Sequence, residues 1–157
     1  HLRYKQQPLV LRNRKGSFEP YDVLTGGPAW AGRGVAIGDI DNDGDTDIVV
    51  SNLGERAYVL RNEGGNRANW LGLSLRGKKS NRDGIGARIR VATSESQIQW
   101  YEVTTGGSYL SAGDRRVLVG LGDRATAEIE IYWPSGFVQR LPKMKSRQWV
   151  AVQEPDR

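Results

Sequence analysis

Nine residues, Asp39 to Asp47, constrain the fold of this chain more than any other segment. Five carboxylates alternate with other side chains along it: Asp39, Asp41, Asp43, Asp45 and Asp47. Runs rich in β-branched and small apolar residues flank it on both sides, at Gly34–Gly38 and Asp47–Ser51. Carboxylates this close together repel one another strongly unless a cation lies among them. The segment therefore predicts a metal-binding loop that joins two β-strands.

The spacing of the loop favours Ca²⁺, which takes about six to eight oxygen ligands from a chain wound around the ion. We expect carboxylate ligands at loop positions one, three, five and nine, which are Asp39, Asp41, Asp43 and Asp47. Gly44, at position six, permits a sharp turn because glycine adopts positive φ without steric cost. Asp45 should contribute its backbone carbonyl, while its side chain points away from the ion.

Other metal sites match the sequence less well. A helical EF-hand needs an acid at position twelve, but that position is Val50, within the β-type run Ile48–Val50. Mg²⁺ prefers a small octahedral shell that keeps several waters. Zn²⁺ favours histidine and cysteine ligands, and neither residue occurs near the loop.

The composition indicates an all-β protein. Twenty glycines and many short β-branched or aromatic runs occur among the 157 residues, and segments of helical period are few. Helices should be nearly absent. Strands are expected at Leu9–Arg12, Gly34–Gly38, Asp47–Ser51, Tyr58–Arg61, Leu71–Leu75, Ala87–Ala92, Ile98–Val103, Arg116–Val119, Glu128–Trp133, Phe137–Leu141 and Trp149–Gln153.

A short repeat divides the chain into two units. Val10-Leu11-Arg12-Asn13 recurs 49 residues later as Val59-Leu60-Arg61-Asn62. That offset is close to the length of a β-propeller blade, roughly 40–50 residues. We expect residues 1–68 to form a propeller blade segment with the calcium loop and residues 69–157 to form a β-sandwich. Because the first copy of the repeat would be truncated, we also expect the chain to be the C-terminal part of a longer protein.

The motifs resemble two known families. Gly34–Gly38 followed by the acidic loop resembles a calcium-binding blade of FG-GAP/VCBS propellers. The second unit resembles the ASPIC/UnbV domain, as in the cartilage acidic protein-like family, through four ordered segments: Asn81–Ile89, Ser108–Ser111, Gly120–Gly122 and Trp133–Gly136. The resemblance implies a secreted or cell-surface protein, with a periplasmic location also compatible, that binds calcium and interacts with other molecules.

These segments also have simple structural interpretations. Trp133–Gly136 should form a hairpin turn between two strands. Gly84 and Gly86 should mark a bulge or a close backbone approach, and Asn81 and Asp83 can cap the same turn. The aromatic residues Trp100, Tyr101 and Tyr109 either form a sugar-stacking platform or pack in the core and across strands.

The remaining features narrow the function. The net charge is +5, and since the acidic loop carries −5 the rest of the chain carries +10. The arginines are scattered rather than clustered, so we expect a solvated basic surface and no nucleic-acid partner. No apolar run is long enough to span a membrane. The only histidine is His1 and cysteine is absent, so no catalytic constellation is recognisable.

We therefore favour a calcium-binding scaffold with a protein or glycan partner over an enzyme, and keep a carbohydrate-active or other hydrolytic role as the alternative. Repeat units are stable only against neighbouring units. Residues 1–68 should accordingly pack on the second unit or self-associate through open blade edges, which light scattering would detect.

Overall fold

The computed structural model describes residues 4–21 and 27–156, and these ranges are almost entirely β-strand and loop. The expected scarcity of helix is confirmed, since the described residues contain a single 3₁₀ turn, η1 (Gly65–Arg67), and no α-helix. Within these ranges no helix has the length and apolar character needed to cross a membrane. His1 lies outside the described residues.

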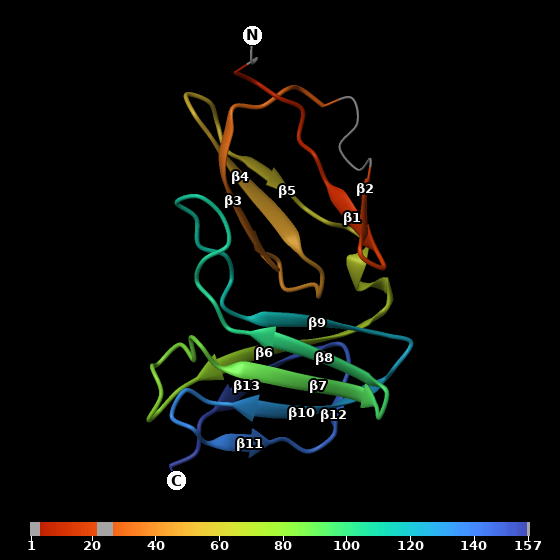
Figure 1. Ribbon diagram of the computed structural model, residues 1–157, viewed down its shortest axis with the longest axis vertical. Helices are drawn as coiled ribbons and strands as arrows, with labels where there is room; N and C mark the ends of the chain where they lie inside the picture. Colours follow the sequence, from red (N-terminus) through yellow and green to blue (C-terminus); the bar gives the residue numbers. More distant parts are fainter. Residues whose placement is uncertain (1–3, 22–26, 157) are drawn as a thin grey trace.

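The first half of the chain contains two small antiparallel sheets, drawn in red to yellow in Figure 1. A hairpin pairs β1 (Leu11–Arg14) with β2 (Ser17–Pro20). A second sheet has the order β3 (Gly32–Gly38), β4 (Asp47–Asn52), β5 (Tyr58–Leu60). The acidic loop joins β3 to β4, as the sequence predicted.

The second half consists of two facing sheets with one hydrophobic core between them (Figure 1). One sheet has the order β13 (Gln148–Gln153), β6 (Asn69–Arg76), β9 (Val117–Gly122), and its β13 runs parallel to β6. The other has the order β11 (Val138–Arg140), β10 (Thr126–Tyr132), β7 (Arg88–Ser94), β8 (Gln97–Glu102), with β12 (Met144–Lys145) also paired to β10. This arrangement is a β-sandwich.

Strand periodicity accounts for the core. Leu71 and Leu73 of β6 are fully buried and alternate with residues on the opposite face of the strand. In the facing sheet, Ile129 and Ile131 of β10 are buried in the same way. Glu128, which precedes Ile129 in the same strand, points to the opposite face and is exposed. Burial of each such side chain stabilises the fold by about 1.5–3 kcal/mol before entropy is counted.

Every expected strand is found, with ends that differ from the expected ones by up to three residues, and two further strands were not predicted. The first strand begins two residues later than predicted, at Leu11, because exposed Leu9 makes no strand pairing. Strand β2 was not predicted, because its four residues are all exposed and include a proline. Strand β12 was also missed, because two residues carry no readable periodicity.

The predicted turns are confirmed. The N–H of Gly136 donates to the carbonyl of Trp133 at 2.9 Å, which closes the hairpin turn between β10 and β11. Asn81 caps its turn by accepting the N–H of Ile85 at 2.9 Å. Gly84 has φ +66, and a Cβ built there would lie 2.9 Å from Cβ of Leu75, so the close backbone approach is real.

Glu154, just after β13, connects the two turns. Its buried carboxylate accepts the N–H groups of Lys78 and Ser80, both at 2.8 Å, and the hydroxyls of Ser80 and Ser135. Burial acts to raise the pKa of Glu154, but these hydrogen bonds outweigh it and lower the pKa to about 2. Glu154 therefore remains ionised in the folded protein at neutral pH.

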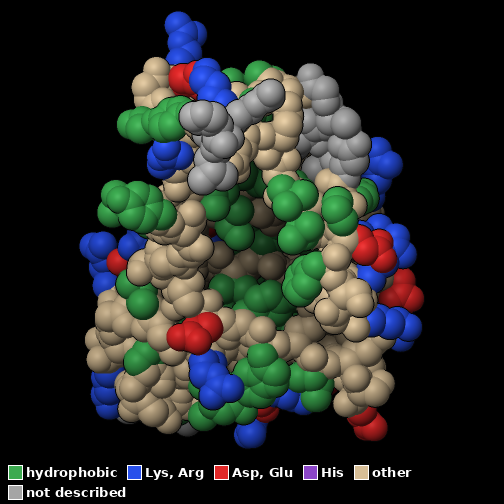
Figure 2. Space-filling view, turned by 45° about the horizontal axis from the view of Figure 1, so that its top comes forward, with side chains coloured by type: hydrophobic (Ala, Val, Ile, Leu, Met, Phe, Trp, Pro, Cys, Tyr) green, Lys and Arg blue, Asp and Glu red, His purple; other side chains and the backbone are tan. Residues whose placement is uncertain are grey.

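The first half leaves much apolar surface open. Its exposed large hydrophobic side chains include Leu9, Leu11, Phe18, Val35, Ile37 and Val59. On the face seen in Figure 2, hydrophobic side chains line a central hollow, whereas Lys and Arg are spread around the periphery. Strand β5 forms an unpaired sheet edge among the described strands. Self-association through such edges stays a prediction.

Candidate metal centre

Three carboxylates of the acidic loop lie close together where the loop joins β3 to β4. Ligand oxygens of Asp39, Asp41 and Asp43 all lie within 4.8 Å of one another. Asp39 is buried, Asp43 is half-buried and Asp41 is exposed, so the cluster opens to solvent on one side. Among the described residues, this is the one group of three or more acidic or histidine side chains close enough to hold an ion together.

Hydrogen bonds from the loop backbone fix these carboxylates. Asp39 accepts the N–H of Asp43 on Oδ1 at 3.1 Å and the N–H of Gly44 on Oδ2 at 2.9 Å. Asp43 accepts the N–H of Asp45 on Oδ1 at 3.1 Å. Such short-range bonds are typical of aspartate in turns, and here they curl the backbone around the cluster.

Gly44 lies at the tightest point of the curl. Its φ is +94, which favours glycine, as the sequence predicted. A second requirement was not visible in the sequence. A Cβ at position 44 would lie 1.8 Å from Cε2 of Trp70, so the Trp70 ring of β6 packs directly against the loop backbone.

The two remaining aspartates lie outside the group of three. Asp47 is buried, and its carboxylate accepts the N–H of Ile40 and the N–H of Asn62, both at 2.9 Å. It thereby closes the base of the loop. Asp45 is also buried and accepts the N–H of Gly65 on Oδ2 at 3.0 Å, so its side chain is engaged with the turn that follows β5.

The carboxylate of Asp45 carries negative charge that the described residues do not fully compensate. Its Oδ1 is buried and has no hydrogen-bond partner among them. Burial raises the pKa of Asp45, and the nearby carboxylates of Asp43 and Asp47 raise it further. A hard divalent cation beside the loop would relieve this repulsion. Because every candidate donor is an oxygen, the loop suits a hard cation.

The sequence repeat supplies part of the loop's surroundings. In its second copy, Arg61 forms an ion pair with Asp41 at 3.2 Å, and Asn62 donates its N–H to Asp47. In the first copy, Asn13 instead accepts the N–H of Gly16 at 2.9 Å within the β1–β2 turn. The repeated residues thus act on the acidic loop only in the second copy.

Two further side chains of the sandwich reach the loop, and no local pattern in the sequence indicates either contact. The indole Nε1 of Trp149 donates to Oδ2 of Asp39 at 3.1 Å. The guanidinium of Arg116 donates to the backbone carbonyl of Asp39 and to Oδ1 of Asn42. These partners are 110 and 77 residues away from Asp39, and local spacing cannot reveal contacts at such separations.

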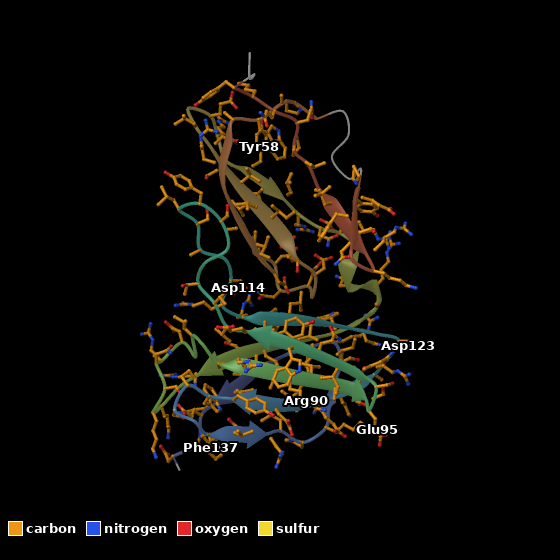
Figure 3. The ribbon with its side chains drawn as sticks, in the orientation of Figure 1. Tyr58, Arg90, Glu95, Asp114, Asp123 and Phe137 are labelled. Carbon is orange, nitrogen blue, oxygen red and sulfur yellow. The ribbon has the colours of Figure 1, made fainter. Side chains whose placement is uncertain are left out.

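The segment 104–116 runs upward from the sandwich beside β3, and Asp114 lies where the two halves meet (Figure 3). Asp114 donates its N–H to the carbonyl of Ile37 at 2.9 Å, and the hydroxyl of Ser108 accepts the N–H of Val35 at 3.2 Å. Strand β3 and the acidic loop therefore pack on the second half of the chain, an arrangement that agrees with the first of the two alternatives expected from the sequence.

The three aromatic residues singled out in the sequence do not form one platform. Trp100 and Tyr101 are consecutive in β8, so their side chains point to opposite faces. Tyr101 packs against the core, whereas Trp100 is 49% exposed and contacts Tyr132, with 5.5 Å between ring centroids. Tyr109 lies on the 104–116 segment and is exposed.

Comparisons with known proteins match both halves of the chain. A family model described as ASPIC and UnbV matches residues 77–157, and one described as an FG-GAP-like repeat matches residues 3–50. Human cartilage acidic protein 1 is 27% identical over 135 residues, which cover 81% of this chain and 20% of that protein. The Xenopus tropicalis protein of the same name is 28% identical over 112 residues, covering 69% of this chain and 17% of that protein. The chain thus spans about a fifth of these relatives.

Proposed function

Because the chain belongs to the ASPIC and UnbV family and carries an FG-GAP-like repeat, we propose that it is a calcium-stabilised extracellular scaffold. In this proposal the ion holds the acidic loop closed, and the β-sheets present loops to a protein or glycan partner, as in adhesion. The observation that carries the proposal is the convergence of Asp39, Asp41 and Asp43, whose ligand oxygens lie within 4.8 Å of one another.

The proposed ligand set combines side chains and backbone. Asp39, Asp41 and Asp43 supply carboxylate oxygens, and Asp45 supplies its backbone carbonyl. Asp47 is the proposed ligand at position nine. Each of its oxygens already accepts one N–H, but a carboxylate oxygen has a second lone pair that can face a cation. Bound there, Ca²⁺ would offset part of the negative charge of the five aspartates.

An extracellular location is supported by the name of the relatives, because cartilage consists largely of extracellular matrix. The hydrolytic role is kept as the alternative, and no specific observation favours it. A glycan-binding screen run beside hydrolysis of generic glycosides separates the two roles. Saturable binding with unchanged glycan supports the scaffold, and turnover supports the hydrolase.

Calorimetric titration of the chelator-stripped chain tests the calcium site. We expect one site in the wild type and none in Asp43→Ala, because this substitution removes a central carboxylate. Asp123→Ala is a matched control, since Asp123 is highly exposed and pairs only with its neighbour Arg124. Absence of binding heat with the wild type at millimolar Ca²⁺, while the protein is folded, would refute the proposal.

A further inference from the structure

Besides the Trp70 ring, two side chains of the sandwich, Trp149 and Arg116, hold the acidic loop from outside its own sheet through hydrogen bonds. Trp149 belongs to β13, and Arg116 directly precedes β9. Both strands flank β6 in one sheet, so the two side chains reach the loop from a common, rigid surface.

Trp149 is fixed on three sides. Its ring lies over Gly72 of β6, where a Cβ would come within 2.2 Å of Cε3. The guanidinium carbon of Arg116 lies 4.2 Å from the centroid of the ring, within cation–π distance. Its indole Nε1 donates to Oδ2 of Asp39 at 3.1 Å. The indole therefore cannot rotate away from Asp39 without losing its packing.

Arg116 holds the backbone of Asp39. It donates to the Asp39 carbonyl and to the Asn42 side chain, and Asp114 orients its guanidinium by accepting Nε–H at 2.7 Å. Asn42 has φ +62, a conformation that few non-glycine residues adopt. Arg116 thus supports the strained part of the loop as well as its first aspartate.

We propose that Arg116 and Trp149 are positioning residues of the calcium loop, so that the sandwich completes the metal centre and calcium binding locks the two halves of the chain together. This inference rests on the proposed function. Groups that orient a ligand from behind commonly change metal affinity tenfold or more when they are removed. Because linkage is reciprocal, whatever the sandwich adds to calcium affinity, calcium adds to the attachment of the sandwich.

The chain offers a matched control for both residues. On the outer face of the other sheet, Arg88 lies over Trp100 at 5.0 Å from its ring centroid, in the same type of contact. Neither residue belongs to the acidic loop or to the side chains that hold it. The substitutions Trp149→Phe and Arg116→Lys can therefore be compared with Trp100→Phe and Arg88→Lys, which make the same chemical changes away from the loop.

The experiment measures calcium affinity by calorimetry for the whole chain. Trp149→Phe keeps an aromatic ring but loses the Nε1 donor. Arg116→Lys keeps the positive charge, so that repulsion of Ca²⁺ is unchanged, but loses the planar fork that contacts Asp39 and Asn42. We expect roughly tenfold weaker binding for each, and unchanged affinity for both controls. Circular dichroism in chelator verifies that each variant is folded.

Hydrogen exchange supplies a second readout that does not depend on affinity. Saturating Ca²⁺ should slow amide exchange in β13 and in segment 104–116 of the wild type, and this effect should be reduced in Trp149→Phe. One outcome refutes the coupling but leaves the calcium site in place: the wild type binds one ion, both variants bind it equally well, and amide exchange in β13 is the same with and without calcium. If the wild type binds no ion, the proposed function itself fails.

Discussion

Gly44 shows how one position can meet two steric requirements. Its φ of +94 suits glycine, and the Trp70 ring occupies the space that any side chain would need. The first requirement follows from the loop motif. The second depends on packing between the loop and β6, which no local sequence pattern predicts.

Gly44→Ala should therefore destabilise the chain more than strain alone would. We expect the free energy of unfolding to fall by at least about 2 kcal/mol, because the added Cβ both strains the backbone and displaces Trp70. Gly54→Ala is the control, since Gly54 has φ +71 but a Cβ there meets nothing within 4 Å. Strain alone should make that change cost about 1–2 kcal/mol. Urea denaturation measures both, and equal losses would contradict the packing role of Trp70.

At the same scale, the aspartates illustrate what a sequence can and cannot reveal. Alternation predicted that Asp39, Asp41 and Asp43 converge, because a tightly wound loop turns alternate side chains inward. It did not predict that Asp47 would accept two backbone N–H groups, or that Trp149 would donate to Asp39. Those bonds depend on the tertiary fold.

Among the elements, the turns around Asn81 and Ser135 are joined by one buried acid. Glu154 accepts four hydrogen bonds from Lys78, Ser80 and Ser135. The turn chemistry of Asn81 and Gly136 was predictable from sequence. The role of Glu154 was not predictable, because its partners Lys78 and Ser80 lie 76 and 74 residues before it in the sequence.

Glu154→Gln should lower the free energy of unfolding at pH 7 by about 1–3 kcal/mol, since an amide cannot replace the charge-assisted hydrogen bonds. The folded-state pKa of Glu154 is about 2, below the ordinary value of 4.5. Its contribution is therefore complete above pH 4.5 and is lost as pH falls from 4.5 towards 2.

Denaturation at several pH values measures this difference. The stability gap between wild type and Glu154→Gln should narrow as pH drops through that window. Glu95→Gln, on the exposed turn between β7 and β8, should leave stability unchanged at every pH. A gap that stays constant down to pH 2 would contradict the role assigned to Glu154.

Strands were easier to predict than the segments between them. β-branched runs such as those of β4 and β10 carry a clear signal in sequence. Segment 104–116 is rich in glycine and serine and resembles an ordinary loop. Its contacts with β3, through Ser108 and Asp114, appear only in the folded chain.

At the scale of the whole molecule, the two halves meet at the acidic loop. The all-β class and the propeller-like and sandwich parts could be predicted from composition, repeat and motifs. Which faces of the two halves meet could not be predicted in this way. That contact depends on Trp70, Arg116 and Trp149, which converge from separate segments of the chain. The boundary at residues 68 and 69 remains a proposal.

The most direct test of a calcium-stabilised scaffold is the melting temperature of the whole chain in chelator and in saturating Ca²⁺. A ligand that binds only the folded state adds about 2.7 kcal/mol at a hundredfold excess over its Kd. For a chain of this size we expect a rise of about 5–10 °C. Asp43→Ala should melt at the same temperature in both conditions. An identical melting temperature for the wild type with and without Ca²⁺ would contradict the account.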